Sequence, residues 1–313
     1  MIKQKTLKNS IGCIGVALHS GQKVSMTLKP GQPDSGIVFR RTDIPGSGGL
    51  IKATWDNVVE TTLCTTLGND DGVTIATVEH LMAALSACSI DNAVIEVSGT
   101  EVPVMDGSAA PFIFLVECAG IVEQDRPRLY IRVLKAISIG DDQKSVSIVP
   151  SNGFTVDFDI DFESAAVSHQ SYSMCMAGEN FKNEVSRART FGFLHEVEAL
   201  RAAGLAKGGS LENAVVVSGD KIINEDGLRY DDEFVRHKVL DAVGDLYLAG
   251  GAILGHFHGV CSGHEATNHL LRALFADKDA WCYDDMSVPK VVVNKPAHAW
   301  SVDVAGSEIT ATA

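Results

Sequence analysis

The stretch FVRHKVLDAVGD, residues 234–245, combines the apolar spacing of a packed helix with polar side chains on one face. His237 and Asp241 are four residues apart, so a helix places them on the same face, and Asp245 continues that face one turn further. The valines and the leucine of the stretch occupy most of the remaining surface. Because little of this helix is left for water, a solvent-exposed ion pair does not explain the polar face. Two metal-binding residue types and a further carboxylate on a buried helix therefore indicate a functional site.

The length and charge of the chain exclude several classes of protein. At about 150 residues per domain, 313 residues predict two domains. A hydrophobic content of 45% with 21% charged residues is typical of a globular protein. The formal net charge of −14 argues against binding to nucleic acid or to an anionic membrane surface. No apolar run approaches the roughly 20 residues that cross a bilayer, so we expect no stable membrane insertion.

The seven cysteines are scattered and include no C-x-x-C pair. This pattern predicts reduced thiols, and it indicates neither a disulfide framework nor a structural zinc knuckle. The N-terminal run MIKQKTLKNSIGCIGVALHSG (1–21) contains glycines and is not followed by a cleavage motif, so it is typical of a strand and not of a signal peptide. We therefore expect a cytoplasmic protein, and we expect it to be a monomer.

The first part of the chain shows strands followed by a helix, a strand and a second helix. Its opening residues alternate strand and turn patterns that Gly and Pro interrupt. Within residues 74–92 the apolar positions from Val78 to Cys88 follow a helical period, residues 93–99 form a buried strand, and residues 107–120 form the second helix. The charges and the proline of QDRPRLY (124–130) end this pattern.

The rest of the chain repeats the same order. Strands and a hairpin lead to the helix of the opening stretch, for which Asp231 or Asp232 suits the N-cap position. A strand in GAILGHFHGV (251–260) and a last helix in GHEATNHLLRALFAD (263–277) follow.

We therefore predict an α+β fold made of a duplicated two-domain unit, in which each half is a β-sheet packed with two helices in a β-α-α-β sandwich. The first half is residues 1–125 and the second half is residues 126–313. Each half carries a histidine near the start of its first helix, His80 in one and His237 in the other. A site between the halves would draw ligands from both.

His80, His237 and Asp241 make a set of two histidines and one carboxylate. Catalytic zinc uses such a set, because three protein ligands leave one position for water. Glu79 precedes His80 on a helix and points about 100° away from it, close enough to reach a metal-bound water without being a ligand. Two alternatives remain open from the residues alone. The same ligands bind Fe(II) in non-haem oxygenases, and a metal-sensing module could hold an ion without catalysis.

Six segments resemble those of the UDP-3-O-acyl-N-acetylglucosamine deacetylases, which are zinc enzymes of lipid A biosynthesis. They read ATVEHL (76–81), MDGSAAPF (105–112), SRARTFGF (186–193), AKGGS (206–210), DEFVRHKVLDAVGD (232–245) and CSGH (261–264). They occur in one order over nearly the whole chain. The resemblance implies a hydrolase that removes the N-acetyl group from UDP-3-O-(3-hydroxyacyl)-N-acetylglucosamine and yields the free amine and acetate.

The resemblance also implies the roles of the site residues. His80, His237 and Asp241 would hold Zn²⁺, and Glu79 would be the general base for the bound water. His264 in its charged form would protonate the departing amine.

Further roles follow from the same resemblance. Asp245 would orient His264 and keep it charged, while Lys238 and Thr190 would contact the substrate or the oxyanion. Phe191 would pack against the sugar ring and Phe162 would stack on uracil. The apolar residues around AKGGS would line a passage for the acyl chain, with Gly208 and Gly209 allowing close approach.

A few residues could mislead. The pair His256 and His258 shares one face of a strand, which suits a metal, but such a pair is more often structural, so we leave it out of the site. His19 opens an HSG turn, which turn chemistry explains without excluding a substrate contact. Cys64 could enter the open metal position or simply be a small buried residue.

Overall fold

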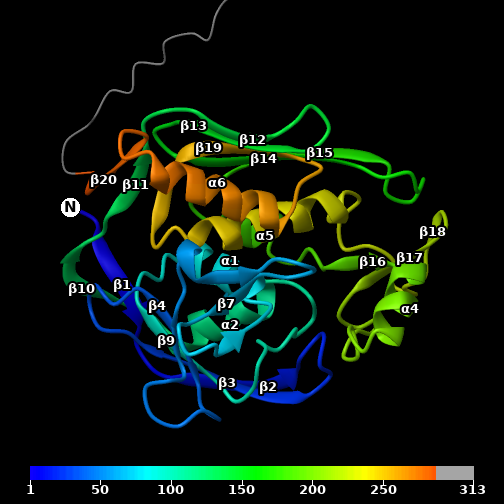
Figure 1. Ribbon diagram of the computed structural model, residues 1–313, viewed down its shortest axis with the longest axis horizontal. Coiled ribbons are helices and arrows are strands. Elements are labelled where there is room, and N and C mark those ends of the chain that lie inside the picture. The colour runs from blue at the N-terminus through cyan, green and yellow to red at the C-terminus, as the bar shows by residue number, and fades with distance from the viewer. Residues whose placement is uncertain (287–313) are drawn as a thin grey trace, which may run out of the picture.

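The computed structural model describes residues 1–286 as a stack of four layers (Figure 1). A sheet lies at each outer face, and two helices from each half of the chain lie between the sheets. The main hydrophobic core fills the space between these layers. The predicted α+β sandwich is thereby confirmed. The predicted second half extends to residue 313, and its residues 287–313 lie outside the described part of the chain.

The first half contributes a five-stranded sheet and two helices. The strand order is β2 (Ile11–Val16), β3 (Lys23–Pro30), β9 (Ala93–Val97), β4 (Ile37–Arg41) and β5 (Leu50–Lys52). Helices α1 (Glu79–Ala87) and α2 (Ala110–Ala119) cover it. Alternating buried positions along β3 and β9 put one face of this sheet into the core.

The second half contributes a seven-stranded sheet and two helices. Its strands are β11 (Tyr130–Val133), β12 (Ile137–Gly140), β13 (Ser145–Pro150), β14 (Phe154–Asp161), β15 (His169–Cys175), β19 (Ala252–Val260) and β20 (Trp281–Asp284). Helices α5 (Glu233–Tyr247) and α6 (His264–Ala276) lie beneath it in Figure 1.

The two sheets share one topology. In the first, β9 pairs antiparallel with β3 and parallel with β4. In the second, β19 pairs antiparallel with β13 and parallel with β14. Each central strand connects the two helices of its own half, α1 with α2 and α5 with α6. This correspondence explains why the same element order recurs in the sequence.

The remaining elements link or extend the halves. Strand β1 (Lys3–Leu7) pairs with β10 (Ile121–Pro127), and β6 (Val58–Glu60), β7 (Thr66–Gly68) and β8 (Thr74–Ile75) form a small sheet beside the short helix η1 (Trp55–Asn57). An insert follows α3 (Asn180–Glu184) and contains β16 (Phe191–Phe193), α4 (Leu194–Ala202), β17 (Val215–Ser218) and β18 (Lys221–Ile222). Figure 1 shows α4, β17 and β18 projecting at one end of the stack.

Helices α1 and α5 approach each other at Gly244. A Cβ atom on Gly244 would lie 2.0 Å from the backbone oxygen of Glu79, so only glycine permits this distance. The contact brings the start of α1, which carries Glu79 and His80, against the middle of α5. The layer of helices therefore places residues from both halves around one point.

The structure adds detail to two local expectations. Asp232 occupies the N-cap position of α5, but its carboxylate makes no capping bond and pairs with Arg236 one turn further along. A charged partner four residues away competes with the helix N-terminus for this side chain. The charged segment QDRPRLY begins as a strand, because β10 continues to Pro127, and the predicted boundary between residues 125 and 126 falls inside it.

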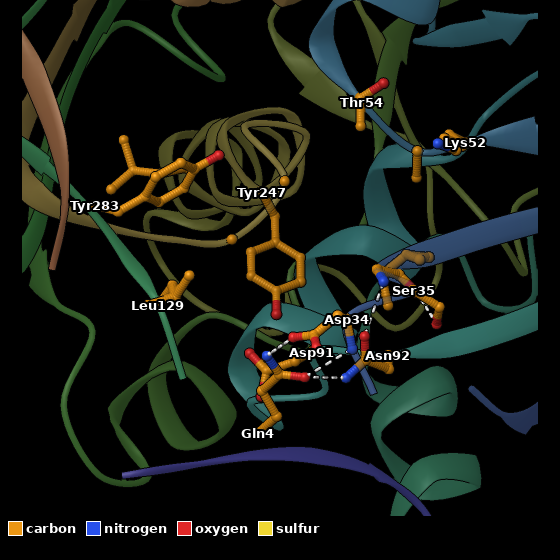
Figure 2. A pocket seen from close by; sticks show the side chains of 16 residues that line it. Gln4, Asp34, Ser35, Lys52, Thr54, Asp91, Asn92, Leu129, Tyr247 and Tyr283 are labelled. Atoms are coloured by element: carbon orange, nitrogen blue, oxygen red, sulfur yellow. Dashed lines mark hydrogen bonds between the residues drawn. The ribbon is translucent and has the colours of Figure 1, made fainter. Parts of the chain in front are cut away.

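A cavity of about 350 Å³ lies where the two halves meet behind α5. Figure 2 shows Gln4, Asp34 and Asn92 on one wall, and dashed lines connect them. Tyr247 at the end of α5 donates a hydrogen bond to the backbone oxygen of Ile90 at 2.8 Å. Because ten residues of helix separate Tyr247 from His237, about 15 Å at 1.5 Å per residue, the cavity is remote from His237.

Candidate active site

His80, His237 and Asp241 lie together in the layer of helices. One ligand atom from each falls within 4.8 Å of the others, and all three residues are buried. The Nε2 atoms of His237 and His80 lie 3.3 Å and 3.6 Å from Oδ1 of Asp241. His80 stands at the second position of α1, while His237 and Asp241 occupy successive turns of α5.

These separations fit a shared cation. Two atoms bound to a tetrahedral zinc at about 2.0–2.1 Å lie roughly 3.3–3.4 Å apart, and such spacing is long for a direct hydrogen bond. Within residues 1–286, Oδ1 of Asp241 has no hydrogen-bond partner although it is buried. Nδ1 of His237 is 3.0 Å from the backbone oxygen of Ala188, an arrangement that leaves Nε2 free for a metal.

The charges of the cluster also suit a metal. Burial lowers the pKa of His237 to about 4, so its ring is neutral, as a ligand must be. Burial opposes ionisation of Asp241, but His237 and His80 hold its pKa below the usual range. For His80, burial lowers the pKa and the facing carboxylate of Asp241 raises it, with a net increase. A cation at this point would take the place of that proton.

Glu79 is almost fully buried beside the cluster, at the first position of α1. Burial raises the pKa of its carboxyl, and the positive charges of His264 and His80 partly offset that increase. Its Oε2 atom accepts a hydrogen bond of 3.1 Å from the backbone N–H of Thr65. Its Oε1 atom lies 3.9 Å from Nε2 of His264. A carboxylate with a raised pKa next to a metal site is suited to accept a proton.

His264, at the start of α6, forms a close pair with Asp245. Nδ1 of His264 lies 2.7 Å from Oδ2 of Asp245, one turn after Asp241 on α5. Burial lowers the pKa of His264, but Asp245 and then Glu79 raise it, and the net value is about 9. The ring is therefore positively charged at neutral pH and can donate a proton.

Lys238 points along the other side of the cluster. Its Nζ atom is 3.9 Å from Oδ2 of Asp241 and 5.7 Å from the centre of the Phe158 ring. A Cβ atom on Gly263, the residue before His264, would lie 3.9 Å from the same Nζ atom. The ammonium group is thus placed between α5 and Gly263, the residue before α6.

The aromatic residues expected to contact substrate lie beside His237. The ring of Phe191 makes edge contacts with His237 at 6.4 Å and with Phe162 at 5.9 Å between centres. Phe162 also contacts Phe193 at 5.6 Å. This aromatic wall joins the cluster to the insert.

A cavity of about 270 Å³ opens between the insert and the first half, next to this wall. Thr190, Phe191 and Gly209, all expected at the substrate, line it. Its other lining is mostly aliphatic and includes Leu18, Leu63, Leu194, Val197, Leu200, Leu211, Val216 and Ile223. A Cβ atom on Gly208 would lie 2.2 Å from the backbone oxygen of Ala17, so this glycine allows the insert to approach the first half.

His19 lines this cavity in addition to opening its turn. Its backbone N–H donates to Glu101 at 2.9 Å, which satisfies the turn. Its ring lines the cavity, and both ring nitrogens lack a hydrogen-bond partner within the described part of the chain. The turn chemistry therefore accounts for the backbone of His19 and not for its side chain.

The other ambiguous residues have local explanations. His256 and His258 each pair with an aspartate on β14, Asp157 and Asp159, at 2.6 Å, on the outer face of the sheet. Cys64 is buried, and burial together with the charge of Glu79 raises the pKa of its thiol to about 12. It therefore remains a protonated, apolar residue in this structure.

Thr65 is a polar residue of the site that sequence patterns did not indicate. It is 2% exposed, and its hydroxyl donates to Oδ1 of Asp245 at 2.6 Å. Its neighbour Cys64 drew attention by residue type, whereas a single threonine between strands carries no comparable signal. Only the folded chain brings residue 65 against residue 245.

Comparisons with known proteins show which proteins the chain resembles. Residues 4–276 match the model of the family described as UDP-3-O-acyl N-acetylglycosamine deacetylase. A protein of Teredinibacter turnerae named UDP-3-O-acyl-N-acetylglucosamine deacetylase is 51% identical over 301 residues, which cover 95% of this chain and 99% of the relative. Proteins of the same name from Marinobacter nauticus and Hahella chejuensis are 50% and 51% identical over 304 residues, or 96% of this chain and 99% and 100% of theirs.

Proposed function

The chain belongs to the family of UDP-3-O-acyl-N-acetylglycosamine deacetylases, and on this premise we propose how the residues around His80, His237 and Asp241 perform the reaction. The enzyme hydrolyses the acetamide of UDP-3-O-(3-hydroxyacyl)-N-acetylglucosamine in lipid A biosynthesis. Acetate leaves and the sugar retains a free amine. The observation that carries the mechanism is the convergence of three metal-type ligands with Glu79 on one side and the His264–Asp245 pair on the other.

We propose Zn²⁺ as the cofactor, held by His80, His237 and Asp241. Two nitrogen ligands and one oxygen ligand at near-tetrahedral spacing support zinc over a harder cation. When bound, zinc supplies a Lewis acid that activates water and polarises the acetamide carbonyl. Iron could occupy the same ligands, so the metal has to be measured in the protein as it is produced.

Glu79 acts as the general base. Its carboxylate adjoins the ligand His80, and its raised pKa gives it the affinity for a proton that an aqueous glutamate lacks. It takes a proton from the attacking water as the new C–O bond forms. Burial of the residue excludes bulk water, which would otherwise compete for the same carboxylate.

His264 acts as the general acid. With a pKa of about 9, the ring holds its proton at neutral pH until the amine departs. As the C–N bond breaks, Nε2 of His264 gives this proton to the amine nitrogen. Asp245 accepts the hydrogen bond from Nδ1 and so fixes the ring with Nε2 toward the reaction.

Lys238, Thr190 and the aromatic wall position the substrate. The ammonium of Lys238, beside Asp241, is placed to stabilise negative charge on the carbonyl oxygen together with the hydroxyl of Thr190. Phe191 packs against the sugar and Phe162 against the uracil base. The acyl chain lies in the aliphatic cavity that contains Gly209.

The enzyme binds the acyl chain of its sugar-nucleotide substrate through this cavity. Within residues 1–286 no helix is long and apolar enough to cross a bilayer. We propose that the enzyme acts in the cytoplasm as a monomer. The presence of the ligands, the base and the acid in one chain supports the monomer.

Metal analysis combined with acetate release tests the mechanism. Alanine at His80, His237 or Asp241 should remove both metal and activity, because the two remaining ligands hold zinc poorly. Glu79→Gln should keep the metal and lower kcat by about 10²–10⁴-fold, the usual worth of a general base. Glu265→Gln, a matched change at an exposed residue of α6, should alter neither the metal content nor kcat. Loss of metal from Glu79→Gln would make Glu79 a ligand, and full metal in an alanine variant would remove that residue from the ligand set.

A further inference from the structure

Thr65 contacts both carboxylates that flank the candidate metal site. Its backbone N–H donates to Oε2 of Glu79 at 3.1 Å, and its hydroxyl donates to Oδ1 of Asp245 at 2.6 Å. The residue is 2% exposed and directly precedes β7. A single residue therefore connects Glu79 on α1 with Asp245 on α5.

These contacts complete a ring of four residues. Asp245 uses its other oxygen, Oδ2, for Nδ1 of His264, and Nε2 of His264 lies 3.9 Å from Oε1 of Glu79. Thr65 thus donates a hydrogen bond to one oxygen of each carboxylate, while the other oxygen of each faces His264. Since a carboxylate accepts and does not donate when ionised, Thr65 is the donor in both bonds.

The backbone of Thr65 also has a structural role. Its carbonyl oxygen accepts a hydrogen bond of 3.3 Å from the N–H of Val78, which holds the start of α1. Any residue except proline at position 65 could make that bond and the bond to Glu79. Only a hydroxyl can make the short bond to Asp245, so the side chain is the informative group.

We propose that Thr65 is a positioning residue for catalysis, and this inference rests on the roles proposed above for Glu79 and His264. Its hydroxyl prevents rotation of the Asp245 carboxylate, so that Oδ2 stays on Nδ1 of His264. Its amide holds Glu79 with Oε1 toward the reaction. Thr65 does not line the acyl-chain cavity in the described part of the chain, so its effect belongs to the chemical step and not to substrate binding.

The test compares Thr65→Val with Thr65→Ser. Valine has nearly the shape of threonine without the donor, and serine keeps the donor. Losing a hydrogen bond to a charged group should lower kcat of Thr65→Val by about 10- to 100-fold with KM unchanged. Thr65→Ser should retain a kcat close to that of the unmodified enzyme. Thr66→Val, the same change at the next residue, should leave both constants unchanged. Thr65→Ala replaces Thr65→Val if the valine variant does not fold.

A double-mutant cycle shows whether Thr65 acts through Asp245. In an Asp245→Asn background, Thr65→Val should lower kcat little further, because Asp245→Asn has already altered the hydrogen bond that Thr65→Val removes. Metal content and melting temperature should stay similar in Thr65→Val and Thr65→Ser. Unchanged kcat in Thr65→Val, a change confined to KM, equal losses in Thr65→Ser, or additive losses in the cycle would each overturn the proposal.

A spectroscopic measurement separates this proposal from the proposed function. The proton on Nδ1 of His264 should give a downfield NMR resonance, which should shift in Thr65→Val and stay in place in Thr66→Val. This result requires no turnover. If the unmodified protein released no acetate from the acylated UDP-sugar, the proposed function would be wrong. The resonance would still report whether Thr65 positions His264. An unshifted resonance in Thr65→Val would overturn the positioning role alone.

Discussion

His264 is a mostly buried residue that remains positively charged because carboxylates face it. Burial lowers the pKa of its ring, and Asp245 at 2.7 Å is the main group that opposes this effect. Glu79, which also faces the ring, has a pKa that burial raises. The facing carboxylates thus raise the pKa of the proposed acid, His264, and burial raises the pKa of the proposed base, Glu79, so both groups bind a proton more strongly than the free side chains do.

We predict that kcat/KM depends on pH as a bell-shaped curve whose alkaline limb lies near pH 9. Above that pH His264 loses the proton that the amine requires. Since the negative charge of Asp245 stabilises the charged ring, Asp245→Asn should lower the pKa of His264 and move the alkaline limb to lower pH. The acid limb, which belongs to Glu79 and the metal site together, should move little. Initial rates across the pH range provide the measurement.

The control for this prediction is another His–Asp pair in the same chain. Asp157→Asn breaks the pair with His256 on the outer face of the sheet and should leave both limbs in place. An alkaline limb that stays in place in Asp245→Asn would show that Asp245 does not maintain the charge of His264.

At the scale of elements, the site depends on the distance between α1 and α5. Glu79 and His80 come from the first turn of α1, whereas His237, Asp241 and Asp245 come from α5. Gly244 allows the two backbones to meet, because a Cβ atom there would be 2.0 Å from the oxygen of Glu79. The same close contact therefore serves packing and the geometry of the site.

Gly244→Ala should force α1 away from α5. We expect a loss of stability of about 1–3 kcal/mol, as for overpacking in a core, together with a lower kcat because Glu79 and His80 move with α1. Thermal melting and acetate release measure the two effects. Gly153→Ala, at a position where a Cβ atom meets no atom within 4 Å, is the matched control. Wild-type kcat in Gly244→Ala would show that the spacing of the helices does not limit the chemistry.

At the scale of the whole molecule, the substrate cavity is shared by the insert of the second half and the first half. Leu18, His19 and Leu63 come from the first half, and the other lining residues come from the insert. The cavity exists only when the halves are assembled. Its mostly aliphatic lining suits an acyl chain, and Phe191 joins it to the metal-type cluster.

Shortening the 3-O-acyl chain of the substrate should reduce kcat/KM by about fourfold for each CH₂ that leaves the cavity, from ~0.8 kcal/mol per buried CH₂. A series of synthetic UDP-sugars with graded chains, compared by acetate release, measures this slope. Equal kcat/KM for the longest substrate and a sugar nucleotide without the acyl chain would exclude the cavity as its binding site.

Much of the fold could be predicted from the sequence because its determinants are local. The apolar period of residues 234–245 predicts a buried helix, and the recurrence of one element order predicts two sheets with paired helices. The four-layer arrangement agrees with that expectation. The grouping of His237, Asp241 and Asp245 on one helical face is likewise a consequence of spacing alone, since an α-helix repeats every 3.6 residues.

The local sequence pattern was less informative where two groups compete for one side chain, or where contacting residues lie far apart in the sequence. The carboxylate of Asp232 pairs with Arg236, while the N–H of Val235 at the helix start donates to the side-chain oxygen of Gln170. The charged residues before Pro127 pair as β10 with β1. Nothing near position 65 in the sequence indicates that its hydroxyl meets Asp245, which lies 180 residues away.

The sequence by itself determined the residue types of the site and the helices that carry them. Only the tertiary structure decided which side chains meet: His80 with Asp241, Asp245 with His264, and Thr65 with the two carboxylates. The physical reason is that helical spacing is set by backbone geometry within a few residues. Contacts between α1, α5 and α6 depend instead on close packing of the layers, where a glycine that admits a neighbouring backbone decides the distance.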